Sequence, residues 1–438
     1  MFTFKGGIYP PQNKEMTAEK RIEIAPIPDK VVISLAQHTG EYSRPIVNIK
    51  DSVKTGQKIA EAVGKASLPV HSSISGRVAA ICPWPDSSGT ETMSIVIESD
   101  GKDELAQGVN VNREYLCFSS EDIRSVLRDA GVSGLGGKSF PAHVKFNPPA
   151  NVEIDTIVLN GCESEPFLTG DQRLMIEYAH DIIQGLKIIM RLVDADKAIV
   201  AIESSKQEAI ARMKQEIKRE PNIWLSVVKA KYPQGNEKHL IDAVLGRKIY
   251  PGKLPFDVGV VLSNAGTALA IRNAVIKNKP LYERVITVTG HGIKEQKNLM
   301  VRIGAQFKDI IKICGGFSGE TRKVISGGPM MGIAQYSLEV PVVKGTTGIL
   351  VLNDTDEQAF SEPEYGEVSC IRCGKCIDSC PRRLIPSAIY INARHQKWEI
   401  LRKYNVHECM ECGACAYGCP AKLNIIQSIK VAKKMLNK

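Results

Sequence analysis

Eight of the twelve cysteines lie between residues 370 and 419, in two copies of one pattern. The copies are Cys370-x2-Cys373-x2-Cys376-x3-Cys380-Pro381 and Cys409-x2-Cys412-x2-Cys415-x3-Cys419-Pro420. Thiolates at this spacing bind two 4Fe–4S cubanes, and the fourth cysteine of each copy ligates the other cluster. One cluster is therefore expected on Cys370, Cys373, Cys376 and Cys419, and its twin on Cys409, Cys412, Cys415 and Cys380.

A pair of zinc sites is the alternative, since paired Cys-x2-Cys is also zinc spacing. Two identical frames that each end in Cys-Pro favour clusters instead. Gly374 and Gly413 follow the second cysteine of each copy, where the backbone must pass close to inorganic sulfide. Such clusters carry electrons one at a time, so the segment indicates electron transfer.

Composition indicates a globular chain of about two to four domains. It has 438 residues, of which 43% are hydrophobic and 24% charged. No window approaches the uninterrupted apolar length of a membrane-spanning helix, and the N-terminus lacks the basic-then-apolar pattern of a secretory signal. Without such a signal, twelve cysteines indicate metal ligation in a reducing compartment and not disulfides.

The formal net charge of +9 is concentrated at the C-terminal end. Residues 370–438 hold thirteen Lys and Arg against four Asp and Glu, which accounts for the whole surplus. A cluster with four thiolates is negative, so we expect these cations to offset it. Docking to an acidic electron partner, or contact with anionic lipid, is the alternative. We expect no nucleic-acid partner.

Helices should hold the cysteine frames in place. The segment from Ile385 to Tyr404 is predicted to be helical. Its expected packing face is Ile389, Ile391, Trp398, Ile400 and Leu401. The stretch from Leu423 to Leu436 has apolar residues with lysines opposite. We expect it to pack on its own domain and not to lie on a membrane surface.

Further upstream, a glycine-rich loop is suited to binding an anion. Ser119 opens a helical pattern that Gly131 ends, and Gly134-Leu135-Gly136-Gly137-Lys138-Ser139-Phe140-Pro141 follows it. Three glycines in four positions let backbone amides turn toward a phosphate, and Lys138 and Lys145 add positive charge. The loop lacks the Walker spacing. A glycine turn without a ligand is the alternative.

Strands alternating with helices must position this loop. We expect strands at 156–160, 197–203, 223–229 and 258–262, with helices at 181–193 and 205–219, as in a parallel sheet. Polar loops beginning at Gly161, Tyr232 and Ser263 follow three of these strands. Open parallel sheets bind ligands at the carboxyl ends of their strands. The three loops are therefore expected to converge on one ligand.

The two motifs Gly-Leu-Gly-Gly-Lys-Ser-Phe-Pro and Asn-Gly-Cys-Glu-Ser-Glu-Pro resemble the flavin- and NADH-binding subunits of respiratory complex I. The chain is identified as a member of the C subunits of Rnf electron-transport complexes, which are ferredoxin:NAD oxidoreductases. The start Phe2-Thr3-Phe4-Lys5-Gly6-Gly7, the Tyr-Pro-Gln-Gly segment at Tyr232 and the C-terminal cluster unit carry this likeness.

The resemblance implies FMN, NAD(H) and two 4Fe–4S clusters as cofactors. The implied FMN-binding residues are Gly134, Gly136, Gly137, Lys138, Phe140, Lys145, Asn160, Glu163, Ser164, Tyr232, Gly235, Asn264 and Thr267. Phe140 and Glu165 match positions that meet the nicotinamide nucleotide. The chain departs from the complex I pattern at Ser139, Cys162 and Asn236. Cys162 is expected to be a small filler, with a reactive thiol as the alternative.

The expected fold class is multidomain α/β. By resemblance, residues 1–110 are expected to hold a barrel-sandwich hybrid of the biotinyl/lipoyl kind, and 111–280 the Rossmann-like flavin and NADH domain. A β-grasp domain of the SLBB kind is expected at 281–350, and the two-cluster ferredoxin domain at 360–438. The barrel has no lysine at the hairpin tip for a prosthetic group, so His71 is expected to be a hydrogen-bonded turn residue and not a ligand. Cys82, Cys117 and Cys314 are expected to be structural.

The implied function is that of the NADH/FMN/iron–sulfur subunit of an ion-translocating ferredoxin:NAD oxidoreductase, an enzyme for which no catalytic side chain is expected. Hydride is exchanged between NAD(H) and FMN, and single electrons pass to or from the clusters. Expected partners are membrane-embedded and ferredoxin-like subunits, with electron exchange with ferredoxin, at the cytoplasmic face of the cell membrane. A soluble cobalamin reductase and a non-enzymatic electron-transfer scaffold are the alternatives.

Overall fold

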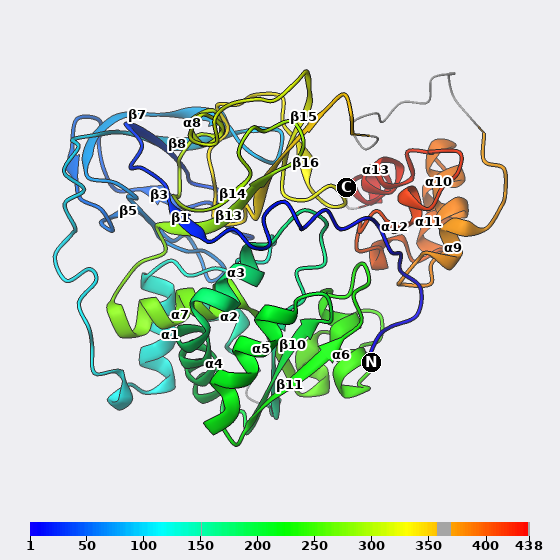
Figure 1. Ribbon diagram of the computed structural model, residues 1–438, viewed down its shortest axis with the longest axis horizontal. Coiled ribbons are helices and arrows are strands. Elements are labelled where there is room, and N and C mark those ends of the chain that lie inside the picture. The colour runs from blue at the N-terminus through cyan, green and yellow to red at the C-terminus, as the bar shows by residue number, and fades with distance from the viewer. Residues whose placement is uncertain (150, 357–368, 437–438) are drawn as a thin grey trace.

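The computed structural model describes residues 1–149, 151–356 and 369–436. Residue 150 in the expected flavin domain, and residues 360–368 and 437–438 of the expected cluster domain, lie outside the described part. Figure 1 shows a barrel and a β-grasp unit above an α/β domain, with the cluster domain at one side. No helix in the described ranges is long and apolar enough to cross a membrane.

The α/β domain is built on a four-stranded parallel sheet in the order β11-β10-β9-β12. Its strands are β9 (Thr156–Gly161), β10 (Lys197–Glu203), β11 (Ile223–Val228) and β12 (Val260–Asn264). Because all four run the same way, their carboxyl ends share one edge. The strand at 258–262 was predicted two residues early: Pro255–Val258 is a 3-10 turn, and Gly259 after it is left-handed.

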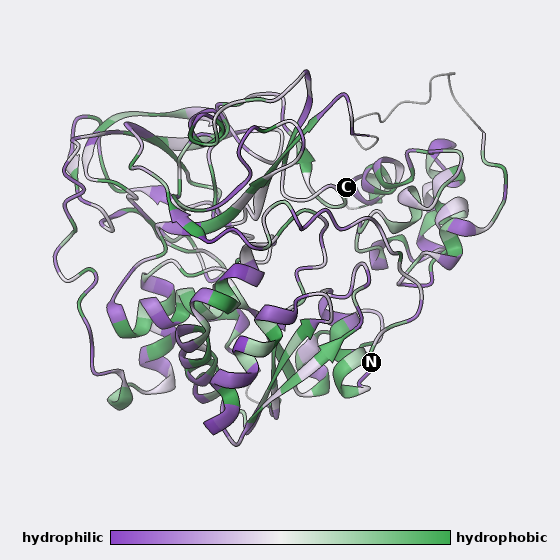
Figure 2. Cartoon of the chain, in the orientation of Figure 1, coloured by the Kyte–Doolittle hydropathy of each residue, from purple (hydrophilic) through white to green (hydrophobic). Residues whose placement is uncertain are grey.

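Helices cover both faces of this sheet. They are α1 (Ser120–Asp129), α2 (Ala142–Lys145), α3 (Gly170–Glu177), α4 (Ala179–Val193), α5 (Gln207–Glu216), α6 (Glu237–Leu245) and α7 (Ala265–Lys277). Alternation along β9 sends Ile157 and Leu159 into the core under α1, α4 and α7, and Val158 into the core under α6. Figure 2 shows these strands in green, with purple outer faces on the helices.

Two details of the helices follow from the sequence. Ser119 caps α1 by accepting a hydrogen bond from the Asp122 amide at 3.1 Å, and the Asp122 carboxylate accepts one from the Ser119 amide. Gly185 lies inside α4 because a Cβ there would stand 2.0 Å from the Ala268 carbonyl oxygen of α7. The glycine therefore lets the two helices pack closely.

The barrel consists of two small sheets around one apolar core. The strands are β2 (Lys30–Ser34), β3 (Arg44–Pro45), β4 (Ser52–Val53), β5 (Lys58–Glu61), β6 (Val70–His71), β7 (Gly76–Pro85) and β8 (Glu91–Ser99). Val31, Ile59 and Ile97 are fully buried in its core. His71 lies in β6 and is buried, so it is a strand residue and not a turn residue as predicted.

The β-grasp unit is a six-stranded sheet in the order β1-β14-β13-β17-β15-β16, with one helix. Its elements are β1 (Ile22–Ile24), β13 (Glu283–Thr289), β14 (Lys297–Arg302), α8 (Phe307–Ile313), β15 (Thr321–Ser326), β16 (Ile333–Ala334) and β17 (Gly348–Asn353). β1 pairs with β14 in parallel, so the N-terminal segment ends in this sheet before the barrel begins.

The cluster domain is helical. Its helices are α9 (Lys375–Asp378), α10 (Pro386–Arg394), α11 (Trp398–Lys403), α12 (Ala414–Tyr417) and α13 (Ile425–Leu436). The helix predicted from Ile385 to Tyr404 is in fact two helices, because Gln396 between them has φ +54°. Of the expected packing face, Ile389 and Leu401 are fully buried and Trp398 partly, whereas Ile391 and Ile400 are exposed.

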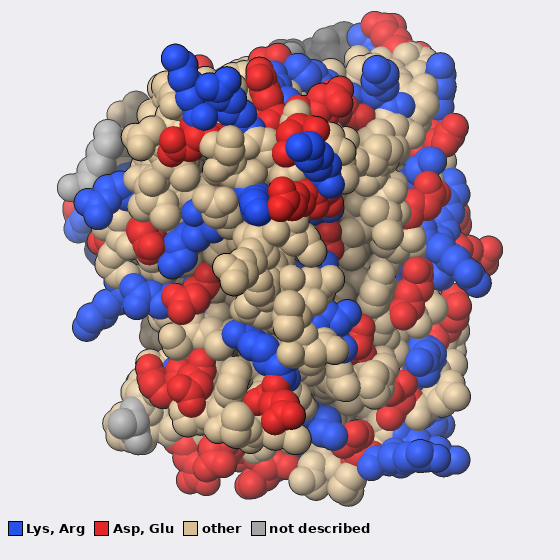
Figure 3. Space-filling model, turned by 90° about the vertical axis from the view of Figure 1, so that its left-hand side faces the viewer, with Lys and Arg blue, Asp and Glu red and all other residues tan. Residues whose placement is uncertain are grey.

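The C-terminal helix packs on its own domain, as predicted from the sequence. Ile425, Ile429 and Ala432 of α13 are buried in the domain core, while Val431 and Met435 face solvent. Figure 3 shows the opposite end of the molecule, where acidic and basic side chains are interspersed. This agrees with the equal numbers of acidic and basic residues before residue 370.

Candidate functional site

The loops that follow β9, β11 and β12 meet at the carboxyl edge of the sheet. The Asn160 side-chain amide donates to the Gly235 carbonyl at 2.7 Å, and the Gly235 backbone amide donates to Ser164 Oγ at 3.2 Å. A Cβ on Gly235 would lie only 3.3 Å from Ser164 Oγ, so the two loops pack too closely here for a larger residue to fit easily. Asn160 and Ser164, predicted from the segment around the end of β9, and Gly235, predicted from the loop after β11, are therefore brought together. We call this edge, with the glycine loop described next, the strand-edge site.

The glycine loop of residues 134–140 lies against the start of α7. The Leu135 amide donates to Thr267 Oγ1 at 2.9 Å, and Asn264 Oδ1 accepts from the Thr267 amide at 3.0 Å. The loop closes through a 2.8 Å hydrogen bond from the Gly134 amide to the Phe140 carbonyl. Two predicted residues, Asn264 and Thr267, thus act as the loop's support.

The outer side of this loop is open. Gly137 has φ +104°, and a Cβ there would meet nothing within 4 Å. A Cβ on Gly136 would lie 3.6 Å from the Asn264 amide nitrogen, an ordinary contact. The loop is therefore an exposed glycine cradle on a fixed base, which fits a phosphate and a flat ring edge. Ser139 has φ +49°, which explains why glycine suits that position in the complex I pattern.

Lys138 and Lys145 differ in their surroundings. Lys138 is exposed, and its carbonyl accepts a 2.6 Å hydrogen bond from Thr39 Oγ1 of the barrel. Lys145 forms an ion pair with Glu237 at the start of α6. Burial raises the pKa of Glu237, but the Lys145 ammonium outweighs it and the pKa falls below its ordinary value. Glu237 was not predicted as a site residue. The available signal was Asn236 before it, because asparagine often caps a helix start and here caps α6.

Glu163 points into the protein. Its carboxylate accepts hydrogen bonds from the Asp171 and Gln172 amides, at 2.7 and 3.2 Å, at the start of α3. It also lies 3.5 Å from the Lys206 ammonium. Glu163 has φ +43°, so the loop after β9 turns sharply there. The Glu163 carboxylate therefore holds the loop after β9 against the start of α3.

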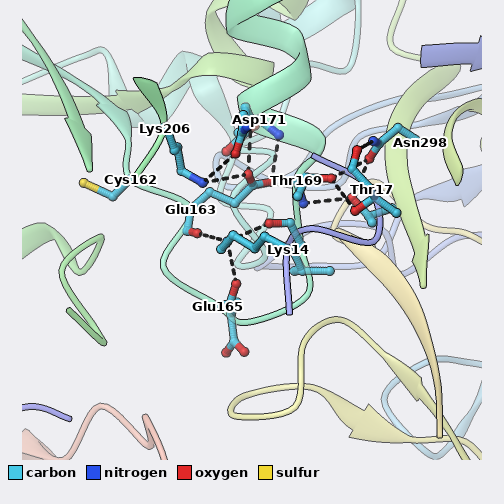
Figure 4. A network of polar contacts seen from close by, with 12 residues as sticks. Lys14, Thr17, Cys162, Glu163, Glu165, Thr169, Asp171, Lys206 and Asn298 are labelled. Atoms are coloured by element: carbon cyan, nitrogen blue, oxygen red, sulfur yellow. Dashed lines mark hydrogen bonds and ion pairs between the residues drawn. The ribbon is translucent and has the colours of Figure 1, made fainter. Parts of the chain in front are cut away.

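A buried ionic network lies beneath this loop (Figure 4). The ammonium of Lys14 donates to the carbonyls of Glu163, Glu165 and Leu168, at 2.7, 2.9 and 2.6 Å. Burial lowers the pKa of Lys14 to about 7, and burial raises the pKa of Glu203 and of Asp171 to about 7. Lys14, Lys206 and Glu203 were not predicted as site residues, because no local pattern marks them.

Glu165 connects the site to the β-grasp unit. Its Oε2 accepts a 3.1 Å hydrogen bond from the Met330 amide, and its Oε1 accepts one of 3.4 Å from the Tyr232 hydroxyl. Burial raises the pKa of Glu165 to about 7, against the lowering effect of the Met330 amide. Phe140, the other predicted nucleotide contact, is 38% exposed, so its ring is accessible for stacking.

The two cysteine frames have the same backbone conformation. In the first frame and just after it, Arg372, Gly374 and Arg383 have φ of +57°, +78° and +54°. The matching residues of the second, Glu411, Gly413 and Lys422, have φ of +58°, +77° and +49°. The sequence repeat is therefore a structural repeat, and its two glycines take the left-handed conformation that favours glycine.

The second frame surrounds a cavity. Its thiol-bearing lining residues are Cys380, Cys409, Cys412 and Cys415. This set combines the last cysteine of the first frame with three of the second, as the interleaved pattern predicts for one cubane. The Leu384 and Glu411 amides donate to the sulfurs of Cys380 and Cys409 at 3.3 and 3.4 Å. The cavity thus has the donors and the amides that suit a cluster.

The thiols surround a space and do not meet at a point. Among the described residues, no three His, Cys, Asp or Glu side chains are placed to hold one metal ion. Burial raises the pKa of Cys412 to about 12, so it must lose a proton when metal binds. Of the other predicted set, Cys376 and Cys419 are buried, Cys370 is half-buried and Cys373 is exposed. The ligand assignments stay predictions.

The remaining cysteines are not part of either frame. Cys162 is buried under α6, and Figure 4 shows its sulfur pointing away from the ionic network. Burial raises its pKa well above that of an ordinary thiol, as expected for a structural cysteine and not for a reactive one. Cys314 is buried in the β-grasp core, Cys82 is half-buried in β7, and exposed Cys117 donates to the Glu114 carbonyl at 3.1 Å.

Family models match four consecutive parts of the chain. They are the RnfC barrel sandwich hybrid domain at residues 2–102, the Nuo51 FMN-binding domain at 127–273, the SLBB domain at 285–334 and the 4Fe–4S dicluster domain at 369–423. These matches confirm the expected fold class and the expected FMN and 4Fe–4S cofactors.

Curated relatives match over almost the whole chain. The C subunit of the proton-translocating ferredoxin:NAD(+) oxidoreductase complex of Clostridium ljungdahlii is 45% identical, over 98% of this chain and 93% of that protein. Its counterpart in the Na(+)-translocating complex of Acetobacterium woodii is 43% identical, over 99% and 96%. The corresponding protein of the ion-translocating oxidoreductase complex of Rhodobacter capsulatus is 40% identical, over 100% and 83%.

Among solved structures, an NAD+-reducing [NiFe]-hydrogenase in the H2-reduced state matches with a TM-score of 0.50 and 17% identity. The match covers 73% of this chain and 62% of that one. It shows a shared fold.

Proposed function

The chain belongs to the family of C subunits of ion-translocating ferredoxin:NAD(+) oxidoreductase complexes, and from this premise we propose that it passes electrons between NAD(H) and two 4Fe–4S clusters through a bound FMN. One observation carries the proposal. The Tyr232 hydroxyl, from the strand-edge site, donates a 2.8 Å hydrogen bond to the carbonyl of Cys412, which lines the cluster cavity. The two predicted cofactor sites are therefore in direct contact.

FMN supplies the chemistry, because it accepts a hydride and releases electrons one at a time. The protein's part is to bind and orient. Amides of the Gly134–Phe140 loop and the Lys138 ammonium would hold the phosphate. Asn160, Ser164, Gly235 and Asn264 would fix the ring system, because each is itself held by a hydrogen bond or a close contact. No side chain of this set is required to act as an acid or a base.

The nicotinamide nucleotide is proposed to bind beside Phe140 and Glu165. Phe140 offers an accessible ring for stacking, and Glu165 is held in place by Met330 and Tyr232. The raised pKa of Glu165 leaves a carboxyl that is neutral or charged according to pH near about 7. A neutral carboxyl offers a hydrogen-bond donor without repelling an anionic nucleotide.

The clusters are proposed to carry electrons to and from partner subunits. The set Cys380, Cys409, Cys412 and Cys415 is in contact with the strand-edge site, while exposed Cys373 belongs to the other set. The names of the relatives describe ion translocation, which takes place across a membrane. We place the chain at the cytoplasmic face of that membrane, bound to membrane-embedded and ferredoxin-like subunits.

Anaerobic purification followed by cofactor analysis and NADH titration tests the proposal. Extractable FMN, about eight iron atoms per chain and bleaching of flavin and cluster absorbance by NADH are expected. Zinc in place of iron, or an NADH-insensitive protein without flavin, would refute it. Reduction of a corrinoid faster than of ferredoxin would favour the cobalamin reductase alternative. Clusters without flavin would favour the scaffold.

A graded pair of variants links the glycine loop to flavin. Gly136→Ala adds only a methyl group at an ordinary contact distance of 3.6 Å and should retain FMN. Gly136→Leu carries a bulky side chain toward Asn264, a predicted flavin contact, and should lose FMN while keeping its iron. Loss of iron with FMN retained would contradict the division between the two sites.

A further inference from the structure

The first residues of the chain form a strap along the α/β domain. Phe2 pairs in parallel with Val228, and the Lys229 amide donates to the Phe2 carbonyl at 2.9 Å. Phe4 is buried, and its ring stacks on that of His239 with centroids 4.7 Å apart. Residues 2–9, which we call the strap, are therefore held by β11 and by the loop and helix that follow it.

The same strap contacts the cluster domain. The Gly7 amide donates to the Ser379 carbonyl at 3.0 Å. Ile8 and Tyr232 exchange two backbone hydrogen bonds, of 2.9 and 3.0 Å. Figure 1 shows the dark blue chain passing between the green α/β domain and the orange and red helices. Consecutive residues thus bind both domains at once.

Two glycines make this double contact possible. A Cβ on Gly6 would lie 2.7 Å from the Cys380 carbonyl oxygen, and one on Gly7 would lie 2.6 Å from the Tyr232 carbonyl oxygen. Both residues also have positive φ, of +77° and +79°. Any other residue would push the cluster domain and the loop after β11 away from the strap.

The strap also closes a small core beside the cluster cavity. Ile8, Tyr232, Cys412 and Ala414 are buried together, with Met330 and Met410 against them. Cys380 and Cys412 both line the cavity predicted for the second cluster. The strap therefore holds residues that line or adjoin the cavity predicted for the second cluster.

We propose that residues 2–9 are a positioning element for electron transfer, clamping the cluster bound by Cys380, Cys409, Cys412 and Cys415 against the flavin side of the molecule. The strap sets the separation and orientation of the two domains, on which the rate of transfer depends. This inference rests on the proposed function.

Gly6→Ala is the test variant, and Gly89→Ala is its matched control. Gly89 has φ +86°, so alanine there carries the same backbone strain, but its Cβ meets nothing within 4 Å. A third protein lacks residues 2–9. FMN and iron are measured first, and stopped-flow absorbance then follows NADH reduction of flavin and of clusters separately. Hydrogen exchange at 379–381 and 410–414 reports the domain contact without NADH.

The clamp predicts that Gly6→Ala keeps both cofactors and the wild-type rate of flavin reduction. Its cluster reduction should slow by about tenfold or more, since small misplacements are costly, and exchange should rise at both segments. The deletion should act more strongly, and Gly89→Ala should behave as wild type. A wild-type rate of cluster reduction in Gly6→Ala, or loss of its clusters, would refute the proposed role of the strap.

The outcomes also separate this inference from the proposed function. If NADH fails to reduce the clusters of the wild-type protein, the proposed function is wrong, and hydrogen exchange alone decides the clamp. Exchange that stays unchanged in Gly6→Ala would then overturn it. Should the deletion variant fail to fold, the comparison of Gly6→Ala with Gly89→Ala still decides.

Discussion

The Lys14 ammonium donates a 2.7 Å hydrogen bond to the carbonyl of Glu163, 149 positions further along the chain. It donates to Glu165 and Leu168 as well, so one side chain from the N-terminal segment holds the whole loop after β9. That loop carries Ser164 and Glu165, both predicted to meet a cofactor. The shape of the strand-edge site therefore depends on a residue outside its own domain.

Replacing Lys14 should damage this loop. Lys14→Met keeps the apolar stem but leaves three buried carbonyls without their donor, and should lower the free energy of unfolding by about 2 kcal/mol or more. It should also weaken NADH binding. Thermal unfolding and the KM for NADH measure the two effects. Lys214→Met, at an exposed position of α5, is the control, and equal behaviour of the two variants would contradict the role of Lys14.

Glu165 should make stability depend on pH. Its pKa in the folded protein is raised by burial from 4.5 to about 7. Its contribution to the free energy of unfolding is therefore fully present below the pKa of the unfolded state, and it is lost as pH rises through about 7. Glu165→Gln removes this loss, so its Tm relative to wild type should be higher at pH 8 than at pH 5.

The control for this pH series is Glu114→Gln, which changes an exposed carboxylate of the same type. Its Tm should follow wild type at both pH values. A Glu165→Gln variant whose Tm difference from wild type stays constant across the series would show that Glu165 does not titrate in that range.

Removing the Tyr232 hydroxyl tests the contact between the two sites. Tyr232→Phe keeps the ring in its buried core but leaves the Cys412 carbonyl and Glu165 short of a donor. We expect a loss of about 1–3 kcal/mol in unfolding free energy, with iron and FMN retained. Urea denaturation measures the change. Tyr250→Phe, at a residue 69% exposed, should be neutral. Unchanged stability in Tyr232→Phe would mean that this hydrogen bond contributes nothing.

The interleaved cysteine sets predict a reciprocal pair of variants. Cys380→Ser and Cys419→Ser should each lower iron from about eight to about four atoms per chain, because each cysteine belongs to the other frame's cluster. Only Cys380→Ser should prevent NADH from reducing the cluster that remains, since its own cluster lies against Tyr232. Electron paramagnetic resonance after NADH addition distinguishes them. Identical spectra would contradict the interleaved assignment.

Several features were predictable because local sequence encodes them. Cluster ligands follow at fixed short spacings, so the frames around Cys373 and Cys412 could be recognised without a structure. The strands before Asn160 and Asn264 are apolar runs that end in polar loops, and parallel strands bring such ends to one edge. Those residues do meet. The helix from Ile385 was overextended, because nothing in the sequence marks Gln396 as left-handed.

The types of cofactor site could be predicted from the sequence, because spacing, glycine content and strand periodicity are local properties. How those sites are joined depends on the folded chain. Lys14 reaches Glu163, Gly7 reaches Ser379 and Tyr232 reaches Cys412 across long stretches of chain, and no periodicity links such pairs. The same packing turned the Glu163 carboxylate inward onto α3. These contacts form because buried polar groups must find partners, and only the folded chain determines which partners are within reach.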